Sequence, residues 1–238
     1  MLSKAKHLRN IMEILYEDNH IIAVNKAPGE IVQGDKTGDT PLVEMLKQWL
    51  KEKYNKPGNV FCGVIHRLDR PVSGVVVFAK TSKALERFNE MLRGHEMKKT
   101  YWAIVKGTPE NPEGTLVHYL IRNEKMNKSF AYDTEKYGSK KAILSYRTIA
   151  RSDNYSLLEV DLQTGRHHQI RCQLAAMGCP IKGDLKYGFP RSNKDGSISL
   201  HAHKVEFIHP VSKLPITIVA PAPSDTLWDT LTSKPSLS

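Results

Sequence analysis

The stretch HRLDRPVSGVVVFAK, residues 66–80, places one acidic side chain, Asp69, between Arg67 and Arg70. Positive charges this close favour the ionised form of a carboxyl group at neutral pH. An ionised carboxylate can be a nucleophile, an electrostatic stabiliser or a metal ligand. The alternative is an ordinary ion pair at the turn of residues 71–74, and the stretch taken alone favours this structural interpretation.

A second polar cluster, TGRHHQIR at residues 164–171, follows an expected strand and opens an expected helix. Its glycine permits a tight turn between the two elements. Arg166 and Arg171 are five positions apart, so they can bracket a ligand from two directions, one reaching the acid and one a phosphate. His167 and His168 are adjacent and would point apart on any helix, which argues against joint metal ligation. Polar residues near a helix start are the simpler interpretation of these histidines.

Aromatic and histidine pairs mark two further strands. Tyr101 and Trp102 in TYWAIVKG are expected to face opposite sides of a strand, one towards the core. The other is able to stack on a nucleobase, although core packing of both is the simpler alternative. His201 and His203 share a strand face, but no acidic or cysteine partner follows at a suggestive spacing, so we expect no metal site.

The composition indicates a basic globular protein. The chain has 35 basic and 25 acidic residues among 238, a formal charge of +10, and suits a polyanionic partner such as a nucleic acid. No apolar run approaches the roughly 18 residues of a membrane span, and residues 1–18 lack the features of a secretory signal. We therefore expect a cytoplasmic protein that binds no membrane. The three cysteines, Cys62, Cys172 and Cys179, have no zinc-type spacing and are expected to be structural thiols.

Strands are expected to outnumber helices. Hydrophobic patterning predicts strands within residues 13–25, 75–79, 100–107, 115–150, 156–162, 197–210 and 214–220. Helices are expected from the Thr40–Pro41 start with Leu42, Val43, Leu46, Trp49 and Leu50 on one face, from about Ser82 with Ala84, Leu85, Phe88 and Leu92 inward, and over residues 170–177 and 225–231. Hairpin-length turns between strands predict one α+β domain over residues 1–238, with its core at about 13–220. Its sheet is expected to be mixed and mostly antiparallel, with flanking helices.

Three motifs occur together in a fixed order: HRLDRPVSG, KKTYWAIVKG about thirty residues later, and LQTGRHHQIRCQLAAMGCPIKGDLKYG. With EILYEDNHIIAVNKAPG near the start, the chain resembles the pseudouridine synthases of the RluA class from about Glu13 to Ala220. HRLD followed closely by Ser-Gly is the most specific of these signatures. The resemblance favours a reactive acid over the structural ion pair at Asp69.

The resemblance implies roles for seven residues. Asp69 would be the catalytic aspartate, Tyr101 the tyrosine that packs on the target base, and Arg171 the arginine paired with the aspartate. RNA contacts are expected from Arg67, which would help hold the flipped-out nucleotide, and from Arg70 and His168. Arg166 is expected to be an RNA contact or a structural contact. The implied reaction isomerises uridine in tRNA or rRNA to pseudouridine, so no cofactor is required. The resemblance leaves open whether the aspartate attacks covalently or assists formation of a glycal.

Two positions depart from the family pattern. Val72 stands where threonine is frequent, and His167 stands where threonine or serine is common. About twelve residues precede the first expected strand, so we expect no separate N-terminal RNA-binding module. Target selection would then fall to the catalytic domain, through the lysine-rich loops near residues 123–141. We expect a monomer.

Two other classes of function stay open at this point. A non-catalytic RNA-binding protein of the same fold would share the basic charge, but it would have no need of all three implied catalytic residues. A glycoside hydrolase would need a second positioned acid. Asp161 and Asp184 flank the arginine cluster, but their spacing does not mark them as a catalytic pair.

Overall fold

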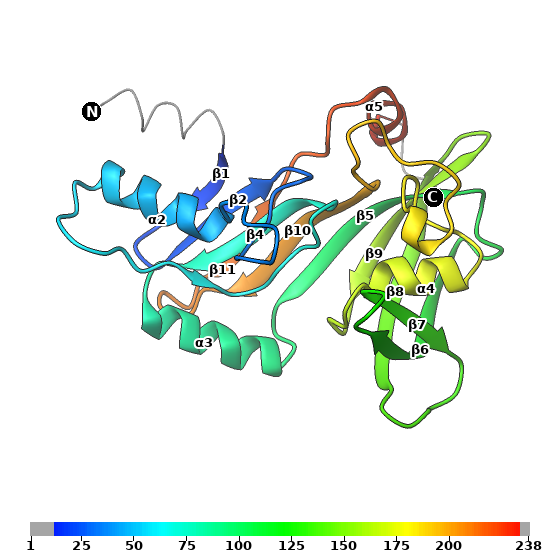
Figure 1. Ribbon diagram of the computed structural model, residues 1–238, viewed down its shortest axis with the longest axis horizontal. Coiled ribbons are helices and arrows are strands. Elements are labelled where there is room, and N and C mark those ends of the chain that lie inside the picture. The colour runs from blue at the N-terminus through cyan, green and yellow to red at the C-terminus, as the bar shows by residue number, and fades with distance from the viewer. Residues whose placement is uncertain (1–11, 234–238) are drawn as a thin grey trace. The chain divides into compact units, whose positions relative to one another are not determined.

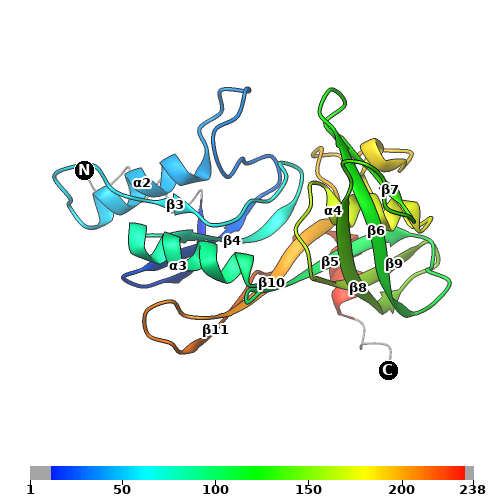
Figure 2. The ribbon, with the colours of Figure 1, turned by 90° about the horizontal axis from the view of Figure 1, so that it is seen from below.

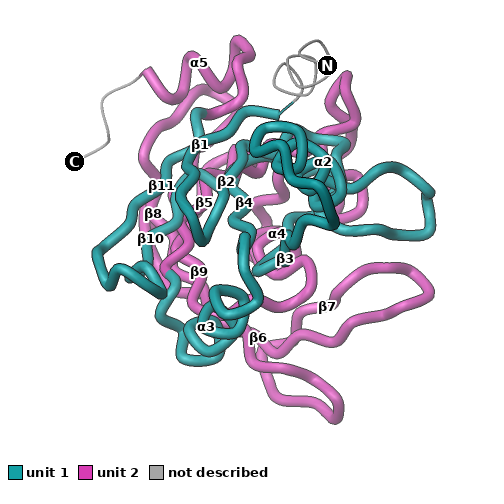
Figure 3. The backbone as a smooth tube through the Cα atoms, turned by 90° about the vertical axis from the view of Figure 1, so that its left-hand side faces the viewer, with its two compact units in different colours: residues 1–97, 202–221 teal, residues 98–201, 222–238 magenta. Residues whose placement is uncertain are grey.

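The computed structural model of the protein describes residues 12–233, and the chain divides into two compact units (Figure 3). Unit 1 contains the chain up to Met97 together with Ala202–Pro221. Unit 2 contains Lys98–His201 together with the chain from Ala222. Each unit has strands and helices of its own. The single domain expected from the sequence stays a prediction.

Unit 1 is built on strands in the order β1-β2-β4-β10, with β3 added to β4 and β11 added to β10. The pairs β1–β2, β2–β4, β3–β4 and β10–β11 are antiparallel. β4 is buried along its whole length, as expected for a run of β-branched residues in a central strand. The strands are β1 (Glu13–Glu17), β2 (Ile21–Lys26), β3 (Gly63–Val64), β4 (Ser73–Ala79), β10 (Leu200–Ile208), most of which belongs to this unit, and β11 (Pro215–Val219).

Two amphipathic helices, α2 (Leu42–Lys53) and α3 (Ser82–Arg93), flank the strands of unit 1 (Figure 2). The apolar face predicted for α2 is confirmed, since all five of its residues are buried: Leu42, Val43, Leu46, Trp49 and Leu50. In α3, Ala84 and Phe88 are buried as predicted, but the third fully buried position is Met91 and not Leu92. The spacing of four and then three residues keeps this set on one face.

The Thr40–Pro41 start predicted for α2 implies that the Thr40 side chain caps the helix, and this is wrong. Pro41 is the N-cap residue, and no side chain caps the helix. The backbone supplies the missing acceptors, because Leu42 N donates to Ile31 O at 2.8 Å and Val43 N to Val32 O at 3.2 Å. These bonds satisfy amides that a capping side chain would otherwise accept from.

Unit 2 contains a five-stranded antiparallel meander in the order β5-β9-β8-β6-β7. Helix α4 lies beside β6 and β7 (Figure 1). The strands are β5 (Lys98–Lys106), β6 (Glu113–Asn123), β7 (Lys128–Tyr132), β8 (Lys140–Arg151) and β9 (Tyr155–Leu162). The helices are α4 (Gln169–Ala176), the 3-10 helix η1 (Leu185–Tyr187) and α5 (Thr226–Thr232).

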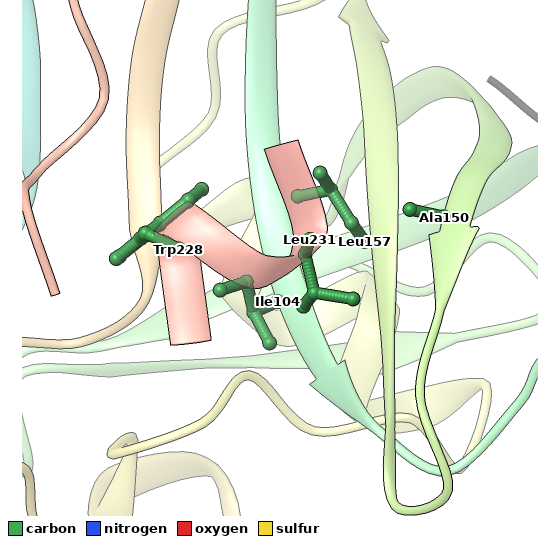
Figure 4. Close-up of a cluster of buried hydrophobic side chains, with 5 residues drawn as sticks. All are labelled: Ile104, Ala150, Leu157, Trp228 and Leu231. Atoms are coloured by element: carbon green, nitrogen blue, oxygen red, sulfur yellow. The ribbon is translucent and has the colours of Figure 1, made fainter. Parts of the chain in front are cut away.

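One apolar cluster of unit 2 fastens α5 to the strands (Figure 4). Trp228 and Leu231 of α5 pack on Ile104 of β5, Leu157 of β9 and Ala150 of β8, all of them buried. Burial of such large side chains contributes roughly 1.5–3 kcal/mol each. The cluster therefore holds α5 on the face of β5 that carries Trp102.

The predicted fold class is confirmed: 19% of the chain is helix and 36% is strand, in a mixed sheet. Among the described residues, no helix is both long enough and apolar enough to cross a membrane. The expectation of no module ahead of the first strand concerns residues 1–11, which lie outside the described part of the chain.

Candidate active site

The HRLD loop begins where β3 separates from β4. The two strands pair only at Gly63–Ala79 and Val64–Phe78. At the next available position, the ring of His66 replaces a strand neighbour, because Val77 N donates to His66 Nε2 at 3.1 Å. His66 Nε2 is therefore the acceptor nitrogen of the imidazole. This bond anchors the loop three residues before Asp69 while the backbone is released from the sheet.

A tight turn follows Asp69, closed by a bond from Val72 N to Asp69 O of 3.0 Å. Lys26, at the end of β2, stabilises this turn through hydrogen bonds to its backbone. Its ammonium donates to Ala27 O at 2.9 Å, Arg70 O at 3.1 Å and Val72 O at 2.7 Å. One side chain thus fixes two carbonyls of the turn that carries the proposed catalytic aspartate.

Lys26 is fully buried, which is rare for a lysine. Burial lowers its pKa to about 8, against opposing contributions from the negative charges of Glu30 and Asp69. The negative charge of Asp69 therefore interacts electrostatically with the Lys26 ammonium. At neutral pH the turn therefore has a positive charge beneath it.

Gly74 follows the turn at a place where β4 and β10 approach closely. Its φ is +116°, and a Cβ added there would lie 2.3 Å from Ala202 O and 2.5 Å from Ala202 N. Only glycine fits both the backbone angle and the space. The glycine of the HRLDRPVSG motif is thus required by packing within unit 1.

The two arginines beside Asp69 have different surroundings. Arg67 is exposed. Arg70 bonds to Asp39 Oδ2 and, at 2.8 Å, to Thr37 Oγ1. Arg70 therefore forms an ion pair with the exposed loop residue Asp39, a partner that the spacing of the motif does not predict.

In unit 2, the loop before α4 is organised by the buried side chain of Gln169. Its Oε1 accepts from Thr164 Oγ1 at 2.8 Å and from Arg166 N at 3.0 Å, and its Nε2 donates to Ile143 O at 3.1 Å. The side chain of Arg166 is exposed, and its Nε donates to Lys141 O at 3.0 Å. The amide of Gln169 thus sets the course of the TGRHHQIR segment.

Arg171 is almost completely buried in α4 and forms a two-bond ion pair with Asp184. The Nε–Oδ2 distance is 2.6 Å and the Nη2–Oδ1 distance is 2.9 Å. The guanidinium also lies 5.1 Å from the centroid of the Tyr187 ring. The two parallel hydrogen bonds fix the position and the plane of the Arg171 guanidinium, as bidentate pairs do.

The expectation that His167 and His168 point apart is wrong. Their rings stack with centroids 3.8 Å apart and planes inclined by 22°. The reason is that α4 begins only at Gln169: His168 is its N-cap residue in the left-handed region, at φ 51°, so helical geometry does not apply.

Hydrogen bonds to neighbouring side chains fix the orientation of both histidine rings. His168 Nδ1 lies 3.0 Å from Tyr187 Oη, which also accepts from Ser129 N at 2.8 Å. His167 Nδ1 lies 2.9 Å from Ser129 Oγ, and its Nε2 lies 3.1 Å from Asn127 Oδ1. Burial raises the pKa of Tyr187 to about 12, so this phenol is protonated throughout the physiological range.

Tyr101 and Trp102 divide between the two faces of β5, as predicted. Trp102 packs against the cluster of Figure 4, and the largely buried Tyr101 therefore points to the opposite face. On that opposite face, the strand neighbour of Tyr101 is Val160 of β9.

Basic and aromatic side chains are interspersed along β7 and the loop that follows it. Lys128 Nζ lies 5.6 Å from the Phe130 ring centroid and Lys136 Nζ lies 5.1 Å from that of Tyr132. Tyr137, between β7 and β8, is fully exposed. Exposed aromatic rings among lysines are typical of surfaces that bind single-stranded nucleic acid.

Four site residues were missed by sequence reasoning: Lys26, Gln169, Asp184 and Tyr187. A lysine that ends a buried apolar strand is a weak signal for Lys26. For Asp184 there is no signal in spacing, since it lies thirteen residues from Arg171 beyond the end of α4.

The two acids considered for a glycoside hydrolase each have another partner. Asp161 accepts a hydrogen bond from Thr100 Oγ1 at 3.1 Å, and Asp184 is paired with Arg171.

The remaining candidates for a functional site are a metal site, the histidines of the HAH stretch and a pocket in unit 1. Within residues 12–233, no group of three or more histidine, cysteine or acidic side chains is arranged to hold a metal ion. His201 packs on the Trp228 ring, and His203 Nδ1 lies 3.2 Å from Ala220 O. A pocket of about 260 Å³ in unit 1 is lined by none of the seven predicted site residues; its lining residues are Arg87, Glu90, Met91, Glu96, Ile208, Pro210 and Lys213.

Comparison with known proteins agrees with this arrangement of motifs. The sequence model described as RNA pseudouridylate synthase matches residues 20–176. An uncharacterized RNA pseudouridine synthase of Synechocystis is 36% identical over 217 residues, which are 90% of this chain and 66% of that relative. The tRNA pseudouridine synthase C of Vibrio cholerae is 33% identical over 244 residues, covering 94% of this chain and 96% of the relative.

Two further comparisons concern an rRNA enzyme and a solved structure. Ribosomal large subunit pseudouridine synthase D of Xylella fastidiosa is 34% identical over 228 residues, covering 90% of this chain and 67% of the relative. The fold is similar to that of human RNA pseudouridylate synthase domain containing 4, with a TM-score of 0.76, 23% identity, and coverage of 92% and 91% of the two chains.

The chain belongs to the RNA pseudouridine synthase family. The resemblance to the RluA class is confirmed, and members of the family are isomerases.

Proposed function

We propose that this protein isomerises specific uridines of tRNA or rRNA to pseudouridine, with Asp69 as the essential carboxylate. The observation that carries the proposal is the construction of the Asp69 turn. Its backbone is fixed by the buried ammonium of Lys26, and its loop is anchored by His66. A preorganised carboxylate within a matched family region is what an enzyme needs and a simple RNA binder does not.

The reaction breaks the bond between uracil N1 and ribose C1′, forms a bond between C5 and C1′, and releases the proton from C5. Asp69 either attacks covalently or assists formation of a glycal. Tyr101 packs on the target base and helps to remove the C5 proton. Arg171 is the third catalytic residue, and Asp184 fixes its guanidinium. No bond change requires a redox cofactor or an external energy source.

RNA contacts are assigned to Arg67, Arg70 and Arg166, whereas His168, also predicted to contact RNA, is assigned a supporting role. Arg67 and Arg166 have exposed side chains suited to phosphate binding. Arg70 contributes less net charge, since Asp39 neutralises it. His168 lies almost buried in the stack with His167 and supports the loop. The target nucleotide must leave its helix, which costs a few kcal/mol that these contacts offset.

The names of two relatives support this substrate class, since one is named for tRNA and one for ribosomal RNA. The lysine-rich loops between β6 and β8 select the target, with Tyr137 as an exposed aromatic contact. The enzyme acts as a monomer in the cytoplasm. The absent hydroxyl at Val72 and the imidazole at His167 change the geometry of substrate binding and leave the proposed catalytic residues intact.

The experiment is release of tritium from RNA labelled at C5 of uridine, run separately on unmodified tRNA and rRNA pools. Release from one pool, followed by mapping of the modified position, would establish the activity and the substrate class. RNA binding without release from either pool would contradict the enzyme and favour the non-catalytic RNA-binding protein.

A further inference from the structure

Lys99 is a lysine of β5 that the proposed mechanism does not use. It lies two positions before Tyr101, so both side chains are on the same face of the strand. Its ammonium reaches the TGRHHQIR segment, since Lys99 Nζ lies 3.9 Å from the position that a Cβ would occupy at Gly165. Lys99 is only partly exposed, whereas its neighbour Lys98 is exposed.

The surroundings of Lys99 give its charge no partner. Burial alone lowers the pKa of this amine, with no carboxylate acting in the opposite direction. Across residues 12–233 no hydrogen bond or ion pair joins Lys99 Nζ to another group. The nearest acid on the paired strand, Asp161, sits opposite Thr100 and is bonded to it on the other face of the sheet.

An ammonium that is partly desolvated and unpaired destabilises a fold. Other lysines of this protein avoid that cost: Lys26 has three carbonyl acceptors, and Lys53 and Lys80 share the carboxylate of Glu17. Retention of an unsatisfied charge beside a site residue is typical of a group that receives its partner from a ligand.

We propose that Lys99 binds a backbone phosphate of the substrate RNA, next to the nucleotide whose base packs on Tyr101. The proposal rests on the proposed function and adds a specific anchor to it. A phosphodiester carries the full negative charge that best offsets a desolvated ammonium, and lysine binds phosphate as a point charge. Two residues of strand span about 7 Å, the scale of a single nucleotide. Lys99 would thus fix the register of the strand while Tyr101 contacts the base.

The test compares Lys99→Met, Lys99→Arg and Lys98→Met with the wild type in equilibrium binding to the RNA that the wild type modifies, at several salt concentrations. Loss of one phosphate contact reduces the slope of log affinity against log salt by about 0.7–0.9. We expect this reduction in Lys99→Met only. Lys99→Arg keeps the charge and should keep the slope, and Lys98→Met removes an exposed charge from the opposite face.

Thermal unfolding provides a second readout. Lys99→Met removes a desolvated charge, so its Tm should equal or exceed that of the wild type while its RNA affinity falls. A purely structural role would lower the Tm and leave the salt slope unchanged.

The outcomes separate this proposal from the one on which it rests. If the wild type releases tritium but Lys99→Met keeps the wild-type slope, Lys99 is not a phosphate ligand and the proposed function stands. An equal loss of slope in Lys98→Met would assign the effect to overall charge and overturn the role of Lys99. If the wild type binds no RNA, both proposals fail.

Discussion

Arg171 and Asp184 form a bidentate ion pair, with an Nε–Oδ2 distance of 2.6 Å and an Nη2–Oδ1 distance of 2.9 Å. The guanidinium and the carboxylate are both almost fully buried. Removal of the Asp184 carboxylate takes two charge-assisted hydrogen bonds from the buried Arg171 guanidinium. We therefore expect Asp184→Asn to lower the free energy of unfolding by about 3–5 kcal/mol. Urea denaturation of Asp184→Asn beside the exposed-site control Asp153→Asn measures this, and equal stability of the two variants would contradict the importance of the pair.

Lys26 predicts a specific dependence of stability on pH. Its pKa is about 8 in the folded protein and 10.5 when unperturbed, so between these values the unfolded chain binds more protons than the folded one. Stability due to this group therefore rises with pH from about 8 to 10.5. The advantage of the wild type over Lys26→Met in the free energy of unfolding should grow across this window.

The same comparison with Lys83→Met, which removes an exposed lysine of α3, should show no such growth of the stability difference with pH.

Lys26→Met should also lower the turnover of RNA by about tenfold or more, equivalent to about 1.4 kcal/mol of transition-state free energy. The physical reason is that the carbonyls of Arg70 and Val72 lose their common donor. Wild-type turnover by Lys26→Met would contradict a role for the ammonium in fixing the turn.

Gly74→Ala is expected to be strongly destabilising, by roughly 3 kcal/mol or more. The added methyl group would collide with the backbone of Ala202 and would also require an unfavourable φ. Gly38→Ala is the matched control, because Gly38 also has a positive φ but nothing within 4 Å of the added group. Gly38→Ala should lose only about 1–2 kcal/mol. Similar losses in the two variants would show that the close approach of the two strands has no energetic consequence.

Tyr101 has two proposed roles that substitution separates. Tyr101→Phe keeps the ring that packs on the base but removes the hydroxyl, so it should retain RNA affinity while the rate of tritium release falls about 10²-fold or more. Tyr101→Ala should weaken RNA binding as well, by about 1–3 kcal/mol. A Tyr101→Phe variant with the wild-type rate would assign the tyrosine to packing alone.

Local patterns predicted most of the elements but few of the contacts. The apolar face of α2 and the opposite orientations of Tyr101 and Trp102 follow from helical and strand periodicity, and the structure confirms them. The stacking of His167 and His168 does not follow from such periodicity, because the helix starts only at Gln169, whose amide is held in part by the distant Ile143 O. The ion pair of Arg171 with Asp184 and the contacts of Lys26 join residues far apart in sequence, and no spacing rule reaches them.

The most direct test of the central claim measures tritium release from C5-labelled substrate RNA by the wild type, Asp69→Asn and the control Asp153→Asn, each at matched RNA occupancy. Asp69→Asn changes the carboxylate by one atom and leaves the backbone bonds of the turn available. We expect wild-type release by Asp153→Asn and none by Asp69→Asn, although Asp69→Asn still binds RNA. Release by Asp69→Asn at the wild-type rate would show that the carboxylate is not the reactive group.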